Sequence, residues 1–237
     1  MKPAPLPENE ESRIKALKEL ELLDTLPEDV YDDITRIASE ICGTPASLIT
    51  LIDTDRQWFK SKHGLVCPET PRDQAFCAHA IVNQEDYFIV PDARYDERFF
   101  DNPLTKNEPY VIFYAGVPLR DKEGHAFGTL CVIDSRPRTL SEQKLLSLKA
   151  LANLVAVHFE LRKTRLELKK ILVMIQNSSN NQIATDLLTS QIKPIVDPML
   201  QEIETLLNGQ PSQGQVQHLN SLQNMAQSLK SVLNATS

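Results

Sequence analysis

Glycine and cysteine are scarce in this chain of 237 residues, which holds 7 Gly and 4 Cys. Glycine-rich phosphate loops of the GxGxxG or Walker type are missing from the sequence, which therefore gives no support for nucleotide chemistry. Four Cys in a chain of this length do not form a disulfide framework, so we expect reduced thiols. No run of 18 apolar residues occurs, and no membrane-spanning segment is predicted.

Positive charge falls short of negative charge, with 25 Lys and Arg against 32 Asp and Glu and a formal net charge of −7. An acidic chain of this kind is a poor general binder of nucleic acid. The N-terminal segment lacks the apolar core of a secretory signal peptide, so we expect a cytoplasmic protein. Neither nucleic acid nor a membrane is an expected partner.

Composition changes near residue 177, where charged residues become sparse and Asn, Gln and Ser become frequent. Three Pro in residues 1–7 predict a disordered tail. A globular domain is predicted over residues 8–165, since 41% hydrophobic residues are enough to form a core. An uninterrupted helical pattern predicts a long connecting helix over residues 140–176, and two amphipathic stretches predict a helical hairpin over residues 183–234.

Within the globular part, apolar residues at helical spacing predict two helices, over residues 8–25 and 27–42. Residues rich in β-branched and aromatic side chains, or alternating in polarity, predict strands. The predicted strands are residues 46–53, 56–62, 87–91, 110–119 and 126–134. Gly116 and Gly128 lie inside two of these strands, where glycine indicates a bulge or a close approach of backbones.

The long helix carries a heptad of apolar residues at Leu154, Leu161, Leu168 and Ile175. After Arg162 little of the globular domain remains to cover this stripe, so a parallel dimeric coiled coil is predicted. The hairpin that follows cannot bury its own apolar stripes, and two copies would form a four-helix bundle. We therefore expect a homodimer.

Residues 56–81 contain several side chains that can bind a ligand or a metal or react with an oxidant. They are the single Trp, two of the four Cys and two of the five His. Cys77 and His79 lie two residues apart on a predicted short helix and point to different sides. They are either a packed thiol and a hydrogen-bonded imidazole, or a redox-sensing or ligand-contacting pair. Zinc would need His63 and Cys67 as well, at spacings that match no common finger pattern, and no metal site is predicted.

Charged residues in the following loops form a second candidate group. Arg72, Asp73 and Asp92 belong to it, and such residues either fix loops through salt bridges or hold an anionic ligand. A helix that starts at Asp73 would also direct free backbone N–H groups at an anion. We predict that Cys77 and His79 share a pocket with these three residues. Tyr114 approaches this pocket from the facing sheet.

Several segments together strongly resemble a GAF domain, the small-molecule sensor module of bacterial signalling proteins. The likeness covers about residues 10–165 and is carried by LDTLPEDVYDDITRIAS, SLITLIDTDRQWFKSKHGL, ETPRDQAFCAHAI, VPDARYDERFFDNP, IFYAGVPL and GTLCVIDSRPRTLS. The resemblance implies an α+β fold, an antiparallel sheet flanked by helices. It also implies a ligand pocket between the sheet and the loops of residues 64–110.

The resemblance has departures that bear on function. Light-sensing relatives of the fold attach a bilin through a Cys placed directly before a His, whereas Ala78 separates the two here. Covalent chromophore binding is therefore not expected. The segment after residue 183 resembles the dimerisation hairpin of sensor histidine kinases, but Thr189 and Lys193 stand where the phosphoacceptor His would be. We expect a degenerate dimerisation region without kinase chemistry.

Three functions remain open at this point. The first is a two-component type of sensor that binds a small molecule or responds to redox state and relays it through a dimeric coiled coil, with a signalling kinase or response regulator as partner. The second is a reductase of free methionine sulfoxide, which would need Cys67 and Cys77 close together. The third is a truncated partner of a histidine kinase. The residues name no cofactor.

Overall fold

The computed structural model describes residues 1–82 and 85–177, and beyond these residues 190, 194, 196–199, 201, 220, 222–224, 226–227 and 230. The chain divides into two compact units, Met1–Leu166 and Glu167–Ser237. We describe each unit by itself.

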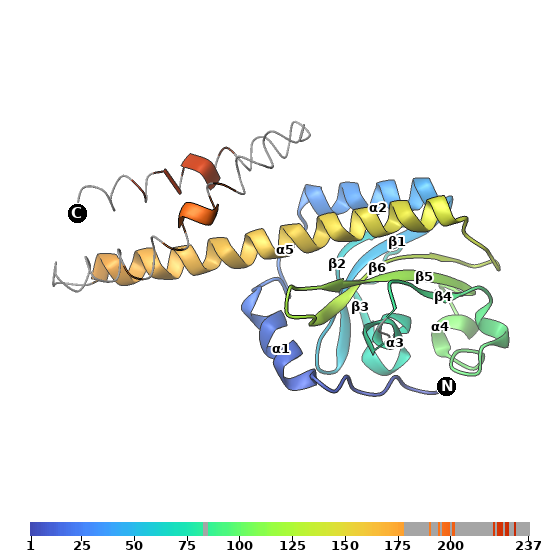
Figure 1. The fold of residues 1–237 in the computed structure, drawn as a ribbon. Helices are drawn as coiled ribbons and strands as arrows, with labels where there is room; N and C mark the ends of the chain where they lie inside the picture. Colours follow the sequence, from blue (N-terminus) through green and yellow to red (C-terminus); the bar gives the residue numbers. More distant parts are fainter. Residues whose placement is uncertain are drawn as a thin grey trace. The chain divides into compact units, whose positions relative to one another are not determined.

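The first unit is built on a six-stranded antiparallel sheet with the strand order β3-β2-β1-β6-β5-β4 (Figure 1). The strands are β1 (Ala46–Ile52), β2 (Arg56–His63), β3 (Glu69–Pro71), β4 (Phe88–Val90), β5 (Phe113–Arg120) and β6 (Ala126–Asp134). Every residue of the two central strands, β1 and β6, is buried, because both faces of the sheet are covered. The fold is thus α+β, as predicted, and the predicted bounds of β6 are confirmed.

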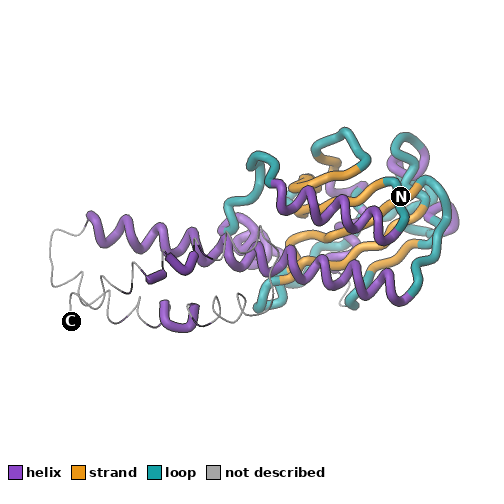
Figure 2. The backbone as a smooth tube through the Cα atoms, turned by 90° about the horizontal axis from the view of Figure 1, so that it is seen from above, coloured by secondary structure: helices purple, strands orange, loops and turns teal. Residues whose placement is uncertain are grey.

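Helices cover both faces of this sheet. They are α1 (Glu10–Glu19), α2 (Asp29–Cys42), α3 (Phe76–Val82), α4 (Pro103–Lys106) and α5 (Glu142–Asn177), with 3₁₀ turns at Arg72–Gln74 and Ala93–Tyr95. One face packs on α1, α2 and the first part of α5 through a shared apolar core. Figures 1 and 2 show α2 and α5 side by side across the strands, with α3 and α4 on the opposite face.

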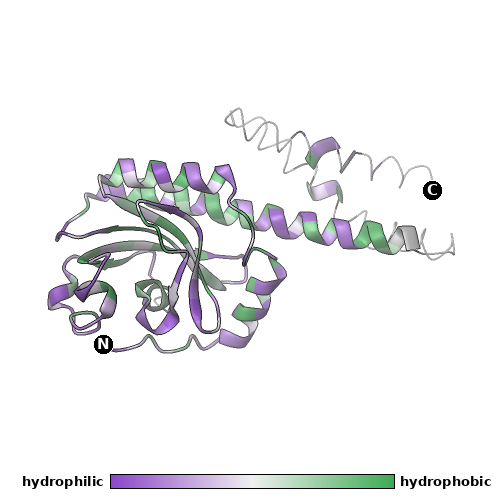
Figure 3. Cartoon of the chain, turned by 180° about the vertical axis from the view of Figure 1, so that it is seen from behind, coloured by the Kyte–Doolittle hydropathy of each residue, from purple (hydrophilic) through white to green (hydrophobic). Residues whose placement is uncertain are grey.

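Each face of the sheet has its own core, because side chains alternate along a strand. Leu130 and Val132 of β6 belong to the core shared with α2 and α5, while Cys131 and Ile133 belong to the core under α3. Hydrophobic residues accordingly dominate the central strands β1 and β6, whereas α2 and α5 present mixed surfaces (Figure 3). Strand β6 is therefore in contact with both cores at once.

Helix boundaries follow local sequence. Gly43 ends α2 in the left-handed region at φ 68°, where a residue without a Cβ is favoured, and its N–H bonds to the Ser39 and Glu40 carbonyls. The predicted start of this helix is two residues early, since Glu28 is the N-cap and Pro27 lies outside the helix. Strand β3 was not predicted, because a strand of three residues carries no periodic pattern.

Residues 1–7 form no helix or strand, but they lie against the domain instead of forming the predicted disordered tail. The Lys2 N–H donates to the Arg98 carbonyl at 3.3 Å, and the Lys2 carbonyl is 3.0 Å from His79 Nε2. The terminal ammonium of Met1 forms an ion pair with Asp101. Three Pro make this segment stiff, which lowers the entropy lost when it is held in place.

The described residues of the second unit include a small apolar cluster. Leu168, at 2% exposure, packs there with Val196 and Ala226, and Ile171, Leu172 and Met199 lie around them. Leu168 is thus covered by later residues of its own chain. The predicted hairpin of residues 183–234 lies mostly outside the described residues, as does the side chain of Ile175. Within the described part of the chain, no helix is long and apolar enough to cross a membrane.

Candidate functional site

Cys77 stands at the centre of a group of polar side chains enclosed between α3 and the sheet. Its Sγ accepts hydrogen bonds from Tyr114 Oη at 3.3 Å and from Thr129 Oγ1 at 3.1 Å. The Sγ of Cys131, on β6, lies 3.9 Å away. Thr50 of β1 stands opposite Thr129 in the strand register, and its Oγ1 is 3.2 Å from Thr129 Oγ1. Three strands and one helix therefore converge on one sulfur atom.

The position of Tyr114 depends on a glycine two residues along the same strand. Tyr114 and Gly116 face the same side of β5, and the tyrosine ring lies over the Gly116 backbone, where a Cβ would come 2.7 Å from the ring carbon Cζ. Only glycine leaves that space. The predicted close approach of backbones is found at Gly128, where a Cβ would meet the Thr50 backbone, whereas at Gly116 the close neighbour is the Tyr114 side chain. The space at Gly116 lets the phenol reach Cys77.

These hydrogen bonds make the Cys77 thiol more acidic than the Cys131 thiol. Burial raises the pKa of Cys77, but hydrogen bonds from Cys131, Thr129, Thr50 and Tyr114 outweigh it and lower the pKa from 9.0 to about 7. Burial, followed by the hydrogen bond and the charge of Cys77, raises the pKa of Cys131 above its ordinary value. The pair therefore loses its first proton from Cys77, since donors converge on that sulfur.

A cavity of about 40 Å³ lies beside this group, between the sheet and the loops. Its lining comes from the strands, from α3 and from the segments 65–70 and 104–111: Leu48, Gln57, Phe59, Leu65, Cys67, Thr70, Phe76, Cys77, Leu104, Pro109, Val111, Tyr114, Cys131 and Ile133. None of these lining residues is a Lys, Arg, His, Asp or Glu. A volume of this size holds about three water molecules. The pocket predicted between the sheet and the 64–110 loops thus has a counterpart in the structure.

Gln57 lines this cavity and has an unpaired polar atom in its side chain. Its side chain is 4% exposed and its amide nitrogen donates to Thr70 Oγ1 at 3.3 Å. No described residue donates a hydrogen bond to its carbonyl oxygen, Oε1. A buried acceptor without a partner costs free energy, on the order of 1–3 kcal/mol. An unsatisfied group of this kind is open to a hydrogen bond from a water molecule or a ligand.

Cys77 and His79 point to different sides of α3, as predicted, and the cavity is lined by Cys77 and not by His79. The ring of His79 packs edge-on against Phe99 with 4.8 Å between centroids, and its Nε2 lies 3.0 Å from the Lys2 carbonyl. Burial lowers the pKa of this imidazole. His79 therefore fits the simpler alternative, a hydrogen-bonded imidazole that packs the N-terminal segment onto the domain.

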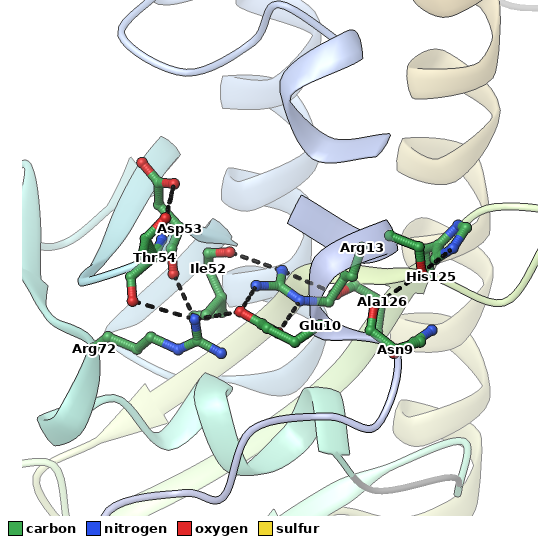
Figure 4. A network of polar contacts seen from close by, with 10 residues as sticks. Asn9, Glu10, Arg13, Ile52, Asp53, Thr54, Arg72, His125 and Ala126 are labelled. Atoms are coloured by element: carbon green, nitrogen blue, oxygen red, sulfur yellow. Dashed lines mark hydrogen bonds and ion pairs between the residues drawn. The ribbon is translucent and has the colours of Figure 1, made fainter. Parts of the chain in front are cut away.

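Arg72 and Asp73 lie away from the cavity, contrary to the predicted shared pocket. Arg72 Nη1 bonds to Glu10 Oε1 at 2.6 Å and to the Asp53 carbonyl at 2.9 Å (Figure 4). Asp73 is exposed on a 3₁₀ turn, and Ala75 is extended, so α3 begins at Phe76 instead of at Asp73. The prediction of an anion site at a helix that starts at Asp73 is therefore wrong.

Asp92, also predicted in the pocket, is an N-cap. Its carboxylate accepts from the Arg94 backbone N–H at 3.1 Å and pairs with the Arg94 guanidinium, which lowers its pKa. Arg98 forms the same pairing with Asp96 at 2.6 Å. The charged loop residues thus fix loops through salt bridges, which was one of the two alternatives.

One group of residues that could hold a metal ion lies outside the cavity. Within the described residues, the one such group is Asp121, Glu123 and His125 in the β5–β6 turn, where Asp121 already accepts hydrogen bonds from His125. The set of His63, Cys67, Cys77 and His79 does not come together as such a group.

Sequence reasoning missed Cys131, Thr129 and Gln57. Cys131 was not among the predicted site residues, whereas its sulfur is the neighbour of Cys77. The available signal was strand alternation, because Thr129, Cys131 and Ile133 must share one face of β6. For Gln57 the signal was a polar residue two positions before Phe59 on a buried strand face.

Comparisons with known proteins agree with this architecture. The GAF domain family is matched over residues 26–159. A cyclic di-GMP phosphodiesterase of Pseudomonas aeruginosa is 43% identical over 152 residues, which are 64% of this chain and 26% of the relative. The chain thus spans about a quarter of that protein.

Solved structures show the same kind of likeness. The blue-light absorbing form of the Thermosynechococcus elongatus PixJ GAF domain has 11% identity and a TM-score of 0.49, with 70% of this chain and 98% of that chain covered. The GAF domain of an Acinetobacter phosphoenolpyruvate-protein phosphotransferase has 18% identity and a TM-score of 0.43, with 62% and 94% covered. Because the family match takes in more than half of the residues, the chain belongs to the GAF domain family.

Proposed function

We propose that this chain is the sensory module of a signalling protein and that the cavity beside Cys77 binds a compact, neutral, mostly apolar molecule with one hydrogen-bond donor. The observation that carries the proposal is Gln57 Oε1, a buried acceptor that no described residue satisfies, on the wall of an otherwise apolar cavity. A donor on the ligand would satisfy it. Buried polar groups in apolar pockets fix the orientation of ligands in this way.

The cavity lining holds no Lys, Arg or His, which disfavours an anionic ligand. An anion buried there would have no cation to pair with, because Arg72, Arg94 and Arg98 bond to acidic side chains outside the cavity. Burial of an unpaired charge is strongly unfavourable. A nucleotide-like or carboxylate ligand is thus disfavoured, and a neutral one is favoured.

Size sets a second limit. At about 40 Å³ the cavity admits a molecule of only a few heavy atoms unless the wall moves. The cavity wall includes Leu65 and Cys67. Their segment is tied to β2 by a backbone bond from the Phe59 N–H to the Pro68 carbonyl, at 3.1 Å, and by the Lys62 ammonium. A larger ligand would displace this segment.

The signal would leave through β6 and α5. Cys131 and Ile133 touch the cavity side, while Leu130 and Val132 pack in the core that contains Val155 and Phe159 of α5. A displacement of β6 by the ligand therefore changes the packing of α5. The ligand acts only if it binds two such arrangements with different affinity.

The output we propose is a change in a dimer formed through residues 151–233, without kinase chemistry in this chain. Val157, Val173 and Met174 of α5 support an apolar contact, since they are 43–62% exposed. The phosphodiesterase relative supports a role for such modules in cyclic-dinucleotide signalling. A kinase or response regulator remains the proposed partner.

Native mass spectrometry of the purified chain tests the proposal. We expect a neutral small molecule on the wild type, its loss in Gln57→Leu, and its retention in Gln143→Leu, an exposed glutamine on α5 that serves as the control. Gln57→Leu should also raise the melting temperature, because it removes an unsatisfied acceptor. Equal retention in wild type and Gln57→Leu would contradict the proposal.

A further inference from the structure

Two cysteine sulfurs from different elements face each other beside the cavity. Cys77 on α3 and Cys131 on β6 are both free, with 3.9 Å between their Sγ atoms. We propose that they form a reversible dithiol that small hydroperoxides oxidise to a Cys77–Cys131 disulfide. The inference rests on the cavity of the proposed function as the path of the oxidant, but it does not require a bound ligand.

The geometry makes the bond reachable by a local movement. A disulfide needs about 2.05 Å between sulfurs, so the two atoms must approach by roughly 2 Å. Cys77 lies on a helix of seven residues, whereas Cys131 is held on a central strand between β1 and β5. The movement therefore falls on Cys77, by a change of its rotamer or a shift of α3.

The surroundings give the two thiols different roles. Tyr114 and Thr129 donate hydrogen bonds to the Cys77 sulfur and stabilise it as a thiolate. A thiolate is the nucleophile in thiol oxidation, so Cys77 is the residue that reacts first with an oxidant. Cys131 keeps its proton longer, because burial and the neighbouring Cys77 raise its pKa. Cys131 is thus the resolving thiol.

The size of the cavity limits which oxidants can reach Cys77 and Cys131. Cys77 and Cys131 both line the cavity, and they are 2% and 0% exposed. A volume that holds about three water molecules admits hydrogen peroxide. A peptide disulfide such as oxidised glutathione is too large to reach either sulfur.

The reaction balances in two steps. The Cys77 thiolate attacks one peroxide oxygen, the O–O bond breaks, and the leaving hydroxide takes a proton to become water, which leaves a sulfenic acid on Cys77. The Cys131 sulfur then attacks the Cys77 sulfur, the S–O bond breaks, and the hydroxyl leaves with the Cys131 proton as a second water. Two thiols are oxidised by two electrons and one peroxide is reduced.

Oxidation would also change the group around the sulfur. The Cys77 sulfur would leave the Tyr114 and Thr129 hydroxyls as it moves toward Cys131, and a covalent bond would join α3 to β6. Because β6 also packs against the core of α5, the disulfide would act on the same strand as the proposed ligand.

Peptide mapping of the reduced full chain after treatment with hydrogen peroxide tests this inference. We expect a linked pair of the peptides that carry Cys77 and Cys131, lighter by two hydrogens, and its reversal by a dithiol reductant. Cys131→Ser should stop the reaction at a sulfenic acid on Cys77 that dimedone traps, and Cys131→Ala tests the same step should serine perturb the fold. Tyr114→Phe should slow the reaction about fivefold at pH 7, since it removes one hydrogen bond to the thiolate.

Two controls separate this inference from ligand binding. Cys42→Ser should leave the linkage unchanged, because Cys42 lies in the core on the other face of the sheet. Gln57→Leu should lose the ligand and still form the disulfide. A Cys67–Cys77 linkage, or oxidation of Cys77 only after unfolding by denaturant, would overturn the inference while leaving the ligand proposal standing.

Discussion

The ring of Tyr114 lies over the backbone of Gly116, in the space that a Cβ at residue 116 would need. We expect Gly116→Ala to displace the phenol from Cys77 and to destabilise the domain by about 1–3 kcal/mol, the usual cost of an overpacked interior. Chemical denaturation measures this change. In a Tyr114→Ala background the same substitution should cost little, and additive effects would contradict the relationship.

Arg13 should be among the residues on which stability depends most. Its guanidinium is fully buried, pairs with Glu10 at 2.8 Å, and donates to the Ile52 carbonyl at 2.8 Å (Figure 4). Arg13→Met removes one of the two arginines that pair with Glu10 and the side-chain donor to the Ile52 carbonyl, and we expect a loss of about 3 kcal/mol. Arg36→Met, which breaks an exposed pair with Asp33, should change the unfolding free energy by less than about 1 kcal/mol.

Acid should destabilise the domain partly through Glu10. Burial raises the pKa of this carboxyl, but hydrogen bonds from Arg13 and Arg72 outweigh burial and lower the pKa from 4.5 to about 2. Its stabilisation is therefore complete above pH 4.5 and is lost as the pH falls toward 2. Urea unfolding between these values should show a shallower decline for Glu10→Gln than for the wild type. Glu11→Gln, exposed on the same helix, should decline as the wild type does.

The proposed dimer gives a prediction for assembly. Light scattering at about 20 μM should return twice 26.7 kDa for the full chain, at a concentration where a stable dimer is populated. Val173→Asp with Met174→Asp should shift the mass toward the monomer, because both side chains are exposed apolar groups on α5. Leu6→Asp, exposed on the N-terminal segment, is the control. A monomeric wild type would contradict the dimer.

The sequence was sufficient for features that depend on local patterns. A run of apolar and β-branched residues located β6, and glycine in a strand indicated the close approach of backbones at Gly128. The sequence was insufficient to predict the direction that the chain takes after an irregular turn. Arg72 and Asp73 are close to Cys77 along the chain, but extended Ala75 separates them from α3, and they lie outside the cavity.

Contacts between residues that are distant in sequence could not be predicted either. Nothing in the local pattern around Cys131 indicates that a helix 54 residues earlier places a sulfur beside it. The unsatisfied oxygen of Gln57 depends on the whole cavity wall, which assembles from four separate segments of the chain. Such sites are properties of the packed structure.

A titration of the ¹⁵N-labelled chain with ethanol tests the central claim most directly, because ethanol joins one hydroxyl donor to a short apolar tail and matches the cavity in size. A ligand of three heavy atoms binds no more tightly than about 1 mM, so the titration should extend to about 100 mM. We predict saturable shifts of the amide signals of Gln57, Tyr114 and Cys131, with loss of saturation in Gln57→Leu and not in Gln143→Leu. Shifts that rise linearly without saturation, or that are unchanged in Gln57→Leu, would contradict a ligand site at Gln57.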